Sequence, residues 1–316
     1  MSARRFTFIG VTTGGSSIMQ IFPRWRDALG LSPDVELVGR DIPVGAAPAD
    51  YRSAVAEIER DPDALGALVT THKIDVYQAA GDLFDRVDEL AEMCGEVSCI
   101  AKRDGRLLAW AKDPIAAGRS LERVLDARHF RDGGGHVLCM GAGGSGTAIA
   151  LYLLARRPGG DRPDRVVVTD RSRERLDRLG ATLARIESGA AVELVHVDGP
   201  GEHESLLAQL PPRSLVVNAT GMGKDVPGSP LSDAAVFPEQ AVVWELNYRG
   251  ALEFLLQARA QAAARGLRVE DGWTYFIHGW TAVMEEVFQR SITPDELGEL
   301  ARAAEFARPR AESEET

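Results

Sequence analysis

The sequence has no uninterrupted apolar run of the roughly 18 to 20 residues that a membrane-spanning helix needs. Its N-terminus passes straight into an apolar strand pattern, without a long secretory core. Positive charge is also scarce: 36 lysines and arginines stand against 47 aspartates and glutamates, which gives a formal net charge of -11. Such a surface repels phosphate backbones and anionic headgroups. We therefore expect a cytoplasmic protein with neither nucleic acid nor membrane as a partner.

Cysteine is equally scarce. Cys94, Cys99 and Cys139 are too few and too unevenly placed for a disulfide framework or a metal-ligand cluster, so we predict no metal site. The composition is ordinary for a globular protein, with 45% hydrophobic and 26% charged residues. A chain of 316 residues is long for one domain and short for three, which favours two domains that share a cleft.

Strand and helix patterns alternate along the chain, which predicts an α/β fold with a mainly parallel sheet. The first part predicts strands at 5–10, 35–38 and 66–70, helices at 51–60 and 76–91, and a hairpin-like stretch at 97–110. The second part predicts strands at 137–140, 166–169, 192–195, 214–217 and 241–244, with helices between them, such as 173–187. The stretch 281–306 is mostly helical, restarts at Thr293-Pro294 and is expected to pack on the first domain.

A glycine-rich motif, GAGGSG at residues 141–146, follows a predicted strand and leads into an apolar helix pattern. In that context GxGxxG is a specific sign of a Rossmann-type dinucleotide site. The first glycine permits a tight turn, the second lets the backbone approach a pyrophosphate, and the last lets helix and strand pack closely. The helix N-terminus adds N–H groups and a positive dipole. The predicted pyrophosphate site is therefore Gly141, Gly143, Gly144, Ser145 and Gly146.

The residues after the next strand read the adenosine ribose in such domains. Asp170 stands first, followed by Arg171 and Arg173. A carboxylate accepts a hydrogen bond from a ribose 2'-hydroxyl and repels a 2'-phosphate, whereas arginine attracts a phosphate. Because Asp170 is closest to the strand, the pattern favours NAD over NADP. The alternative for the two arginines is a solvated helix start.

Four further segments make the chain resemble the shikimate dehydrogenase family, including its quinate dehydrogenase relatives, over nearly the full length. GALVTTHK at 66–73 is similar to the family's GxNVTxPxK segment with one residue missing, and WAKD at 110–113 resembles its NTD segment. VNATGMG at 217–223 matches the NAT motif of the nicotinamide site, and ELNY at 245–248 resembles the D-x-x-Y segment. The resemblance implies a first domain of residues 1–112 completed by 273–316, and a Rossmann domain of residues 113–272.

The resemblance also assigns roles to side chains. Hydride transfer to or from an alcohol carbon needs a group that takes or gives the hydroxyl proton, and a lysine in a closed cleft can do this. Lys73 would be that acid/base, and Asp113 would hydrogen-bond the ammonium. The alternatives are a solvated lysine and a helix N-cap before Pro114. The other implied contacts are Asn218, Thr220 and Gly221 for the nicotinamide, and Ser16, Thr70, Ser98 and Tyr248 for the substrate.

Departures from the family concern the substrate. Ile18 replaces the second serine of the S-x-S-P loop; Ser98 replaces the asparagine of GAVNT; and Gly279, Glu253 and Ala111 replace other polar groups. Each hydrogen bond lost to a substrate hydroxyl costs about 1–3 kcal/mol. We therefore predict a shikimate-dehydrogenase-like oxidoreductase that uses NAD or NADP on a cyclic alcohol or ketone other than shikimate. Two interpretations are open for Trp110, Trp280 and His278. They lie near a substrate that is aromatic or has a larger ring, or they are ordinary packing residues.

Three alternatives remain open at this point. One is a true shikimate or quinate dehydrogenase with rearranged contacts. Another is a catalytically silent dinucleotide-binding protein, against which the retained lysine and aspartate argue. A methylene-folate-type dehydrogenase has a similar two-domain plan but fits the NAT and D-x-x-Y segments less well. The sequence is also compatible with a homodimer.

Overall fold

A computed structural model describes residues 3–156, 158–224 and 226–309, and the statements below concern that part of the chain. The chain divides into two compact units. The first unit holds the residues up to Asp113 together with Ile277–Arg308, and the second is centred on Pro114–Phe276. Each unit is an α/β structure built on one six-stranded sheet, so the predicted fold class is confirmed.

The first unit contains a mixed sheet in the order β2-β1-β3-β5-β6-β4. Its strands are β1 (Arg4–Gly10), β2 (Val35–Asp41), β3 (Ala64–Val69), β4 (Arg86–Val87), β5 (Cys99–Arg103) and β6 (Arg106–Trp110). Strands β1, β2 and β3 run parallel, whereas β5 pairs antiparallel with β3 and β6. Asp104 and Gly105, with φ of 51° and 77°, make the tight turn of the β5–β6 hairpin.

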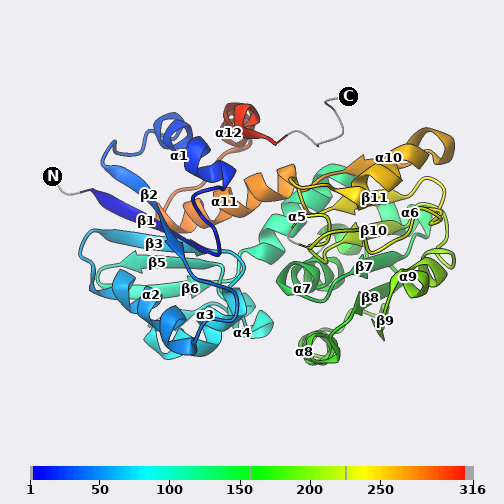
Figure 1. The fold of residues 1–316 in the computed structure, drawn as a ribbon, viewed down its shortest axis with the longest axis horizontal. Coiled ribbons are helices and arrows are strands. Elements are labelled where there is room, and N and C mark those ends of the chain that lie inside the picture. Colours follow the sequence, from blue (N-terminus) through cyan, green and yellow to red (C-terminus); the bar gives the residue numbers. More distant parts are fainter. Residues whose placement is uncertain (1–2, 157, 225, 310–316) are drawn as a thin grey trace. The chain divides into compact units, whose positions relative to one another are not determined.

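Helices cover both faces of this sheet. They are α1 (Ser17–Ala28), α2 (Pro48–Arg60), α3 (Lys73–Ala80), α4 (Glu89–Cys94), the later part of α11 (Trp273–Val287) and α12 (Pro294–Ala304). Helices α2 and α3 lie on one face, and α1 lies with α12 on the other (Figure 1). The Trp25 indole N–H of α1 donates to the Leu300 carbonyl of α12 at 2.8 Å. Thr293 caps α12 in a capping box, so the predicted helix restart is confirmed.

The stretch 76–91, predicted to be mainly helical, is helical at its two ends and interrupted between them. The chain leaves α3 at Ala80, makes a 3-10 turn at Gly81–Leu83 and pairs β4 with β6 before α4 begins. Asp82, Asp85 and Asp88 explain the break, because aspartate competes with helical hydrogen bonds and favours turns and caps. The Asp85 carboxylate accepts from the Leu107 N–H, and the Asp88 carboxylate from the Ala91 N–H.

The second unit contains an all-parallel sheet in the order β12-β11-β10-β7-β8-β9. Its strands are β7 (Val137–Met140), β8 (Arg165–Asp170), β9 (Ala191–His196), β10 (Leu215–Asn218), β11 (Val242–Glu245) and β12 (Arg268–Glu270). Numbered within the unit, the order is 3-2-1-4-5-6, that of the Rossmann fold. The order reverses between β7 and β10, where such sheets bind ligands beyond the strands' carboxyl ends.

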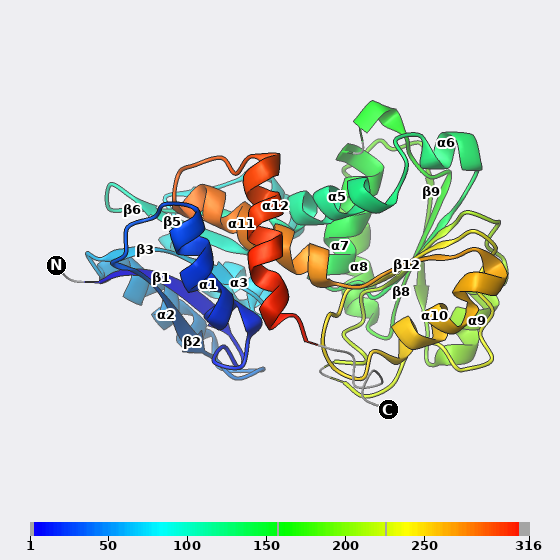
Figure 2. The same cartoon turned by 90° about the horizontal axis from the view of Figure 1, so that it is seen from above.

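Six helices accompany this sheet: α5 (Asp113–Val124), α6 (His129–Gly133), α7 (Gly144–Leu151), α8 (Arg173–Leu183), α9 (Pro200–Leu207) and α10 (Glu253–Arg265). Figure 2 views the sheet almost edge on, with α7 and α8 on one face and α9 and α10 on the other. In the described part of the chain, no helix combines the length and apolar character that crossing a bilayer requires. Those residues likewise bring no three histidine, cysteine, aspartate or glutamate side chains together as a metal site.

Candidate functional site

Lys73 and Asp113 form an ion pair in the first unit. Lys73 is the first residue of α3, just beyond the carboxyl end of β3, and its ammonium donates to Asp113 Oδ2. The side chains are 19% and 10% exposed, so this lysine is not the solvated one of the alternative interpretation. The contact that the resemblance implied is therefore present, while its catalytic role stays a prediction.

A third ionisable group, Glu96, belongs to this cluster and was missed from the sequence. Glu96 is 1% exposed, and no described residue hydrogen-bonds its Oε1. The next N–H, of Val97, donates to the Lys73 carbonyl at 3.0 Å, which ties the two segments together. The signal was present in the resemblance, since Glu96 stands where the family's GAVNT segment has an alanine.

Two groups of this cluster, Lys73 and Glu96, have shifted pKa values. Burial acts to lower the pKa of Lys73, but the charges of Asp113 and Glu96 outweigh it and the pKa is raised. Burial and the charge of Asp113 raise the pKa of Glu96 to about 7, although Lys73 opposes the shift. Lys73 is therefore an ammonium at neutral pH, and Glu96 changes its charge in the physiological range.

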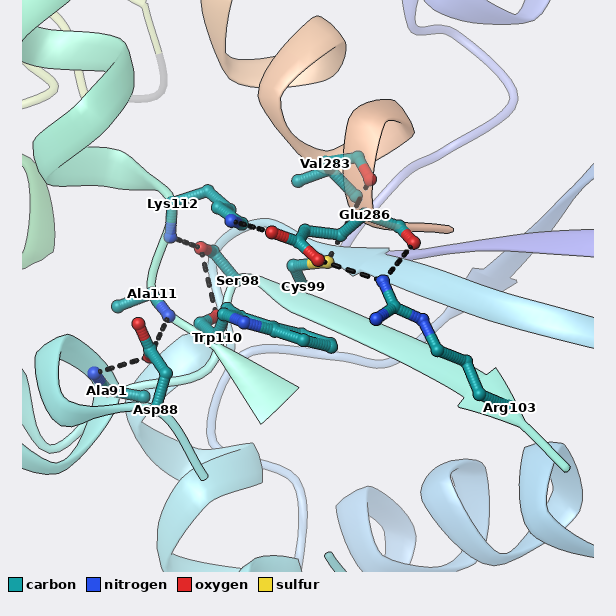
Figure 3. Close-up of polar contacts among 10 residues, drawn as sticks. All are labelled: Asp88, Ala91, Ser98, Cys99, Arg103, Trp110, Ala111, Lys112, Val283 and Glu286. Carbon is teal, nitrogen blue, oxygen red and sulfur yellow. Dashed lines mark hydrogen bonds and ion pairs between the residues drawn. The ribbon is translucent and has the colours of Figure 1, made fainter. Parts of the chain in front are cut away.

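The segment before Asp113 is held by the side chains of Asp88 and Ser98 (Figure 3). The Ala111 N–H donates to Asp88 Oδ1 at 3.1 Å, and the Lys112 N–H donates to Ser98 Oγ at 2.7 Å. Ser98 is 2% exposed, and its hydroxyl lies 3.5 Å from the Trp110 carbonyl. The predicted substrate ligand Ser98 thus bonds the backbone that positions Asp113.

Lys112 itself is bound to α11. Its ammonium pairs with Glu286 Oε1 at 2.6 Å, and Arg103 pairs with Glu286 Oε2 at 2.8 Å (Figure 3). The two cations lie 5.6 and 5.1 Å from the centroid of the Trp110 ring, within cation–π range. Burial acts to raise the pKa of Glu286, but the hydrogen bond and charge of Lys112, with those of Arg103, lower it. The charge of Lys112 is therefore compensated within the first unit.

The other predicted substrate residues fall in both units. Ser16, 8% exposed, precedes α1 without capping it, and Ile18 is fully buried. The Thr70 hydroxyl donates to the Ile9 carbonyl at 3.2 Å. Tyr248 belongs to the second unit, where its ring lies 5.3 Å from that of Trp273 and 4.8 Å from that of Phe276.

Trp280, considered from the sequence as a pocket residue, is a core residue. Its ring packs edge-on against Phe6 and Phe8, with centroids 6.0 and 5.0 Å apart, and it is 4% exposed. Ordinary packing, one of the two interpretations open from the sequence, therefore describes Trp280.

In the second unit, the glycine motif has the geometry that a bound pyrophosphate requires. Gly141 has a φ of 113°, and a Cβ on it would lie 2.5 Å from the Ala219 carbonyl oxygen. A Cβ on Gly146 would lie 1.9 Å from the Gly141 carbonyl oxygen, so helix and strand touch through this glycine. Gly143 faces open space, and α7 begins at Gly144, next to Ser145. The backbone N–H groups at a helix start suit an anion.

A cavity of about 150 Å³ adjoins the motif. It is lined by residues from four strand ends, among them Gly141, Gly143, Asp170, Arg171, Arg175, Asp198, His203, Thr220 and Met222. Asp170 is fixed at its edge, because its carboxylate accepts from the Ala142 and Ser172 N–H groups, each at 2.8 Å. Each oxygen retains lone pairs for a further donor. The cavity, the glycine turn and the carboxylate fit the pyrophosphate and ribose of a dinucleotide.

A buried polar network orders the segment 218–221, which the resemblance assigned to the nicotinamide. Asn218 Oδ1 accepts from the Thr220 hydroxyl at 2.6 Å, and Asn218 Nδ2 donates to Glu245 Oε2 at 2.6 Å. Glu245 Oε1 accepts from the Asn247 N–H at 2.7 Å. Glu245 is fully buried, and burial raises its pKa to about 8 against the effect of these hydrogen bonds. Gly221 follows with a φ of 78°, a turn that glycine favours.

No model of a known protein family matches the chain. A shikimate dehydrogenase (NADP(+)) from Symbiobacterium thermophilum is 31% identical over 264 residues, which are 83% of this chain and 83% of that protein. The crystal structure of shikimate 5-dehydrogenase from Thermus thermophilus, in complex with NADP(H) and shikimate, is 25% identical with a TM-score of 0.67, over 95% of this chain and 99% of that chain. Quinate dehydrogenase from Corynebacterium glutamicum, in complex with NAD, shares the fold at a TM-score of 0.71 and 20% identity, over 96% and 99% of the two chains.

Proposed function

Because the chain belongs to the shikimate dehydrogenase family, and so is an NAD(P)-dependent oxidoreductase acting on CH–OH groups, we propose that its substrate is a cyclic alcohol or ketone other than shikimate. The state of Ser98 carries this proposal. Its short side chain replaces a longer amide and is already bonded to the Lys112 N–H. The buried Ile18 offers no hydroxyl where the family has its second serine. Shikimate would leave several polar groups unpaired here, at about 1–3 kcal/mol each.

Lys73 handles the proton in the proposed reaction. A bound nicotinamide dinucleotide would supply or accept the hydride. The 141–146 motif, Asp170 and the Asn218–Gly221 segment would hold this dinucleotide. Lys73, kept as an ammonium by Asp113 and Glu96, gives its proton to the oxygen of a ketone as the alcohol forms. In the oxidation direction the same nitrogen must first lose a proton, so raising the pH favours oxidation. Asp113 fixes the ammonium in place.

NAD is the proposed preferred cofactor. Asp170 supports the preference, because its carboxylate lines the cavity and would repel a 2'-phosphate. Arg171 and Arg175 also line the cavity, but the Arg175 guanidinium lies 3.8 Å from Asp170 Oδ2, so part of its charge is compensated. The named relative from Symbiobacterium is an NADP(+) enzyme, so this chain differs from it in the proposed preference.

The test is the initial rate of NAD and NADP reduction with shikimate, quinate and a panel of uncharged ring alcohols at matched enzyme concentration. Turnover of another ring alcohol with NAD supports the proposal. Strong turnover of shikimate or quinate would instead favour a true shikimate or quinate dehydrogenase. No turnover of any member would favour a silent dinucleotide-binding protein.

Two substitutions test the proton role. Lys73→Ala should abolish turnover and leave the Kd for the dinucleotide nearly unchanged, since Lys73 lies in the first unit and the glycine motif in the second. Lys73→Arg keeps a cation beside Asp113 but does not release a proton near neutral pH, so it should be inactive as well. An active Lys73→Arg enzyme, or loss of dinucleotide binding in Lys73→Ala, would contradict the assigned role.

A further inference from the structure

Glu96 places a second carboxylate beside the Lys73–Asp113 pair. The pair alone is neutral, because one ammonium faces one carboxylate. Glu96 is 1% exposed, its charge raises the pKa of Lys73, and the charge of Asp113 raises the pKa of Glu96. When Glu96 is ionised, the cluster therefore carries a net charge of about -1, in surroundings that screen charge poorly.

The other ionisable groups around Glu96 do not cancel this charge. Cys94, at the end of α4, interacts with Glu96, Asp113, Asp88 and Lys73, and burial raises its pKa, so it stays a neutral thiol. Asp88 adds negative charge from the start of α4. Lys73, on α3, is the cation that faces Glu96, and it is already paired with Asp113.

The resemblance implies that the S-x-S-P loop binds the substrate carboxylate, and in this chain that loop is incomplete. It retains Ser16, but the buried Ile18 replaces its second serine. Lys112, the next lysine in the segment that leads to Asp113, is bound to Glu286 at 2.6 Å. An anionic substrate would thus lie near the carboxylates of Glu96 and Asp113, and the ammonium of Lys73 is already paired with Asp113.

We propose that Glu96 makes this site select uncharged substrates, so that the natural substrate is a neutral ring alcohol or ketone rather than a hydroxy acid. The inference rests on the proposed function, because the substrate must lie at Lys73 to meet the charge of Glu96. It adds the charge class of the substrate and the residue that determines it.

A linkage relation follows from the titration of Glu96. An anion bound at Lys73 disfavours the ionised form of Glu96, so its binding is accompanied by proton uptake once Glu96 is ionised. The affinity for an anion should therefore fall above about pH 7, by up to tenfold per pH unit, where Glu96 loses its proton. An uncharged ligand of the same shape should show little of this dependence.

Shikimate and its uncharged methyl ester are matched probes. Their Kd values for the protein saturated with NAD are measured by calorimetry from about pH 6 to about pH 9, where the shikimate carboxylate is ionised. The variants are Glu96→Gln, which keeps the shape, and Glu96→Ala, which restores the residue of the GAVNT segment. Glu92→Gln removes the same charge from an exposed position on α4 and is the matched control. Thermal unfolding shows whether each variant is folded.

Wild-type protein and Glu92→Gln should bind the ester more tightly than shikimate, with a gap that widens up to tenfold per pH unit above about pH 7. In Glu96→Gln and Glu96→Ala the gap should stay constant with pH, and shikimate should bind more tightly than to wild type at the upper end of the range. Parallel pH profiles for the two probes in wild type, or an unchanged profile in both Glu96 variants, would overturn the inference.

A measurement without substrate separates this inference from the proposed function. The rate at which acetic anhydride modifies Lys73, followed by mass spectrometry, reports the fraction of unprotonated amine at each pH. Loss of the Glu96 charge should lower the pKa of Lys73, so the modification rate should rise severalfold in Glu96→Gln and stay the same in Glu92→Gln. Equal rates in all three proteins would overturn the inference even if ring alcohols are turned over. A raised rate without turnover of any ring alcohol would leave the charge coupling intact and remove the proposed function.

Discussion

Glu245→Gln should reverse the order of stability between wild-type and variant protein as the pH rises. Glu245 is fully buried at the end of β11, and both of its oxygens accept hydrogen bonds, from Asn218 and Asn247. Glutamine has nearly the same shape but carries no charge at any pH. It also places an amide NH₂ beside one of the two donors, so one hydrogen bond is lost, at about 1–3 kcal/mol.

The magnitude follows from the pKa of Glu245. Burial raises this pKa from 4.5 to about 8, so between these values the unfolded chain has lost a proton that the folded sheet keeps. The contribution of Glu245 to wild-type stability is full below pH 4.5 and falls as the pH rises to about 8, by roughly 1.4 kcal/mol per pH unit, or about 5 kcal/mol over the three and a half units. The variant lacks this loss. Wild type should therefore be the more stable protein near pH 5, and the variant by about 2–4 kcal/mol above pH 8.

Hydrogen exchange of the β10 and β11 amides, read by mass spectrometry, measures the opening of this sheet alone. Wild type, Glu245→Gln and the exposed control Glu239→Gln are compared at the same pH, so that the intrinsic pH dependence of exchange cancels. The control should follow wild type at every pH. The contrary result is a free energy of opening that differs between wild type and Glu245→Gln by the same amount and with the same sign from pH 5 to above pH 8. That result would show that the folded protein does not hold Glu245 protonated.

Two further predictions concern the predicted site residues. Asp170→Asn removes the charge that would repel a 2'-phosphate, so the ratio of kcat/KM for NAD to that for NADP should fall at least tenfold; an unchanged ratio would show that other groups read the ribose. Ser98→Ala leaves the buried Lys112 N–H unpaired, so the free energy of unfolding should fall by about 1–3 kcal/mol in a urea titration. If Ser98 is instead mainly a substrate ligand, as the resemblance implied, KM would rise and stability would hold.

The second unit was the more predictable part of the fold. Val137–Met140 is an entirely buried apolar strand and was predicted at the bounds that the structure has. A buried parallel strand followed by glycines leaves few local alternatives, so sequence and structure agree there. The interruption within the stretch 76–91 was not predicted, because a two-residue strand and a six-residue helix are too short to produce a periodic signal.

The site was predictable only where the resemblance provided a motif. It implied the contact between Lys73 and Asp113, which the structure contains. It did not reveal that Ser98 bonds the backbone, because that depends on where β5 places the hydroxyl relative to residue 112. Glu96 was overlooked for a similar reason: a glutamate between a glycine and a valine has no periodicity that shows its burial.

The bond between Trp25 and the Leu300 carbonyl joins residues that are 275 positions apart in the sequence. The first unit needs Ile277–Arg308 to cover one face of its sheet, so it is incomplete until the ribosome has added these residues. The Rossmann unit is continuous from Pro114 to Phe276 and has all its strands at an earlier moment of synthesis. The order of folding during translation is thus inverted: the half that carries Lys73 is made first and is completed last.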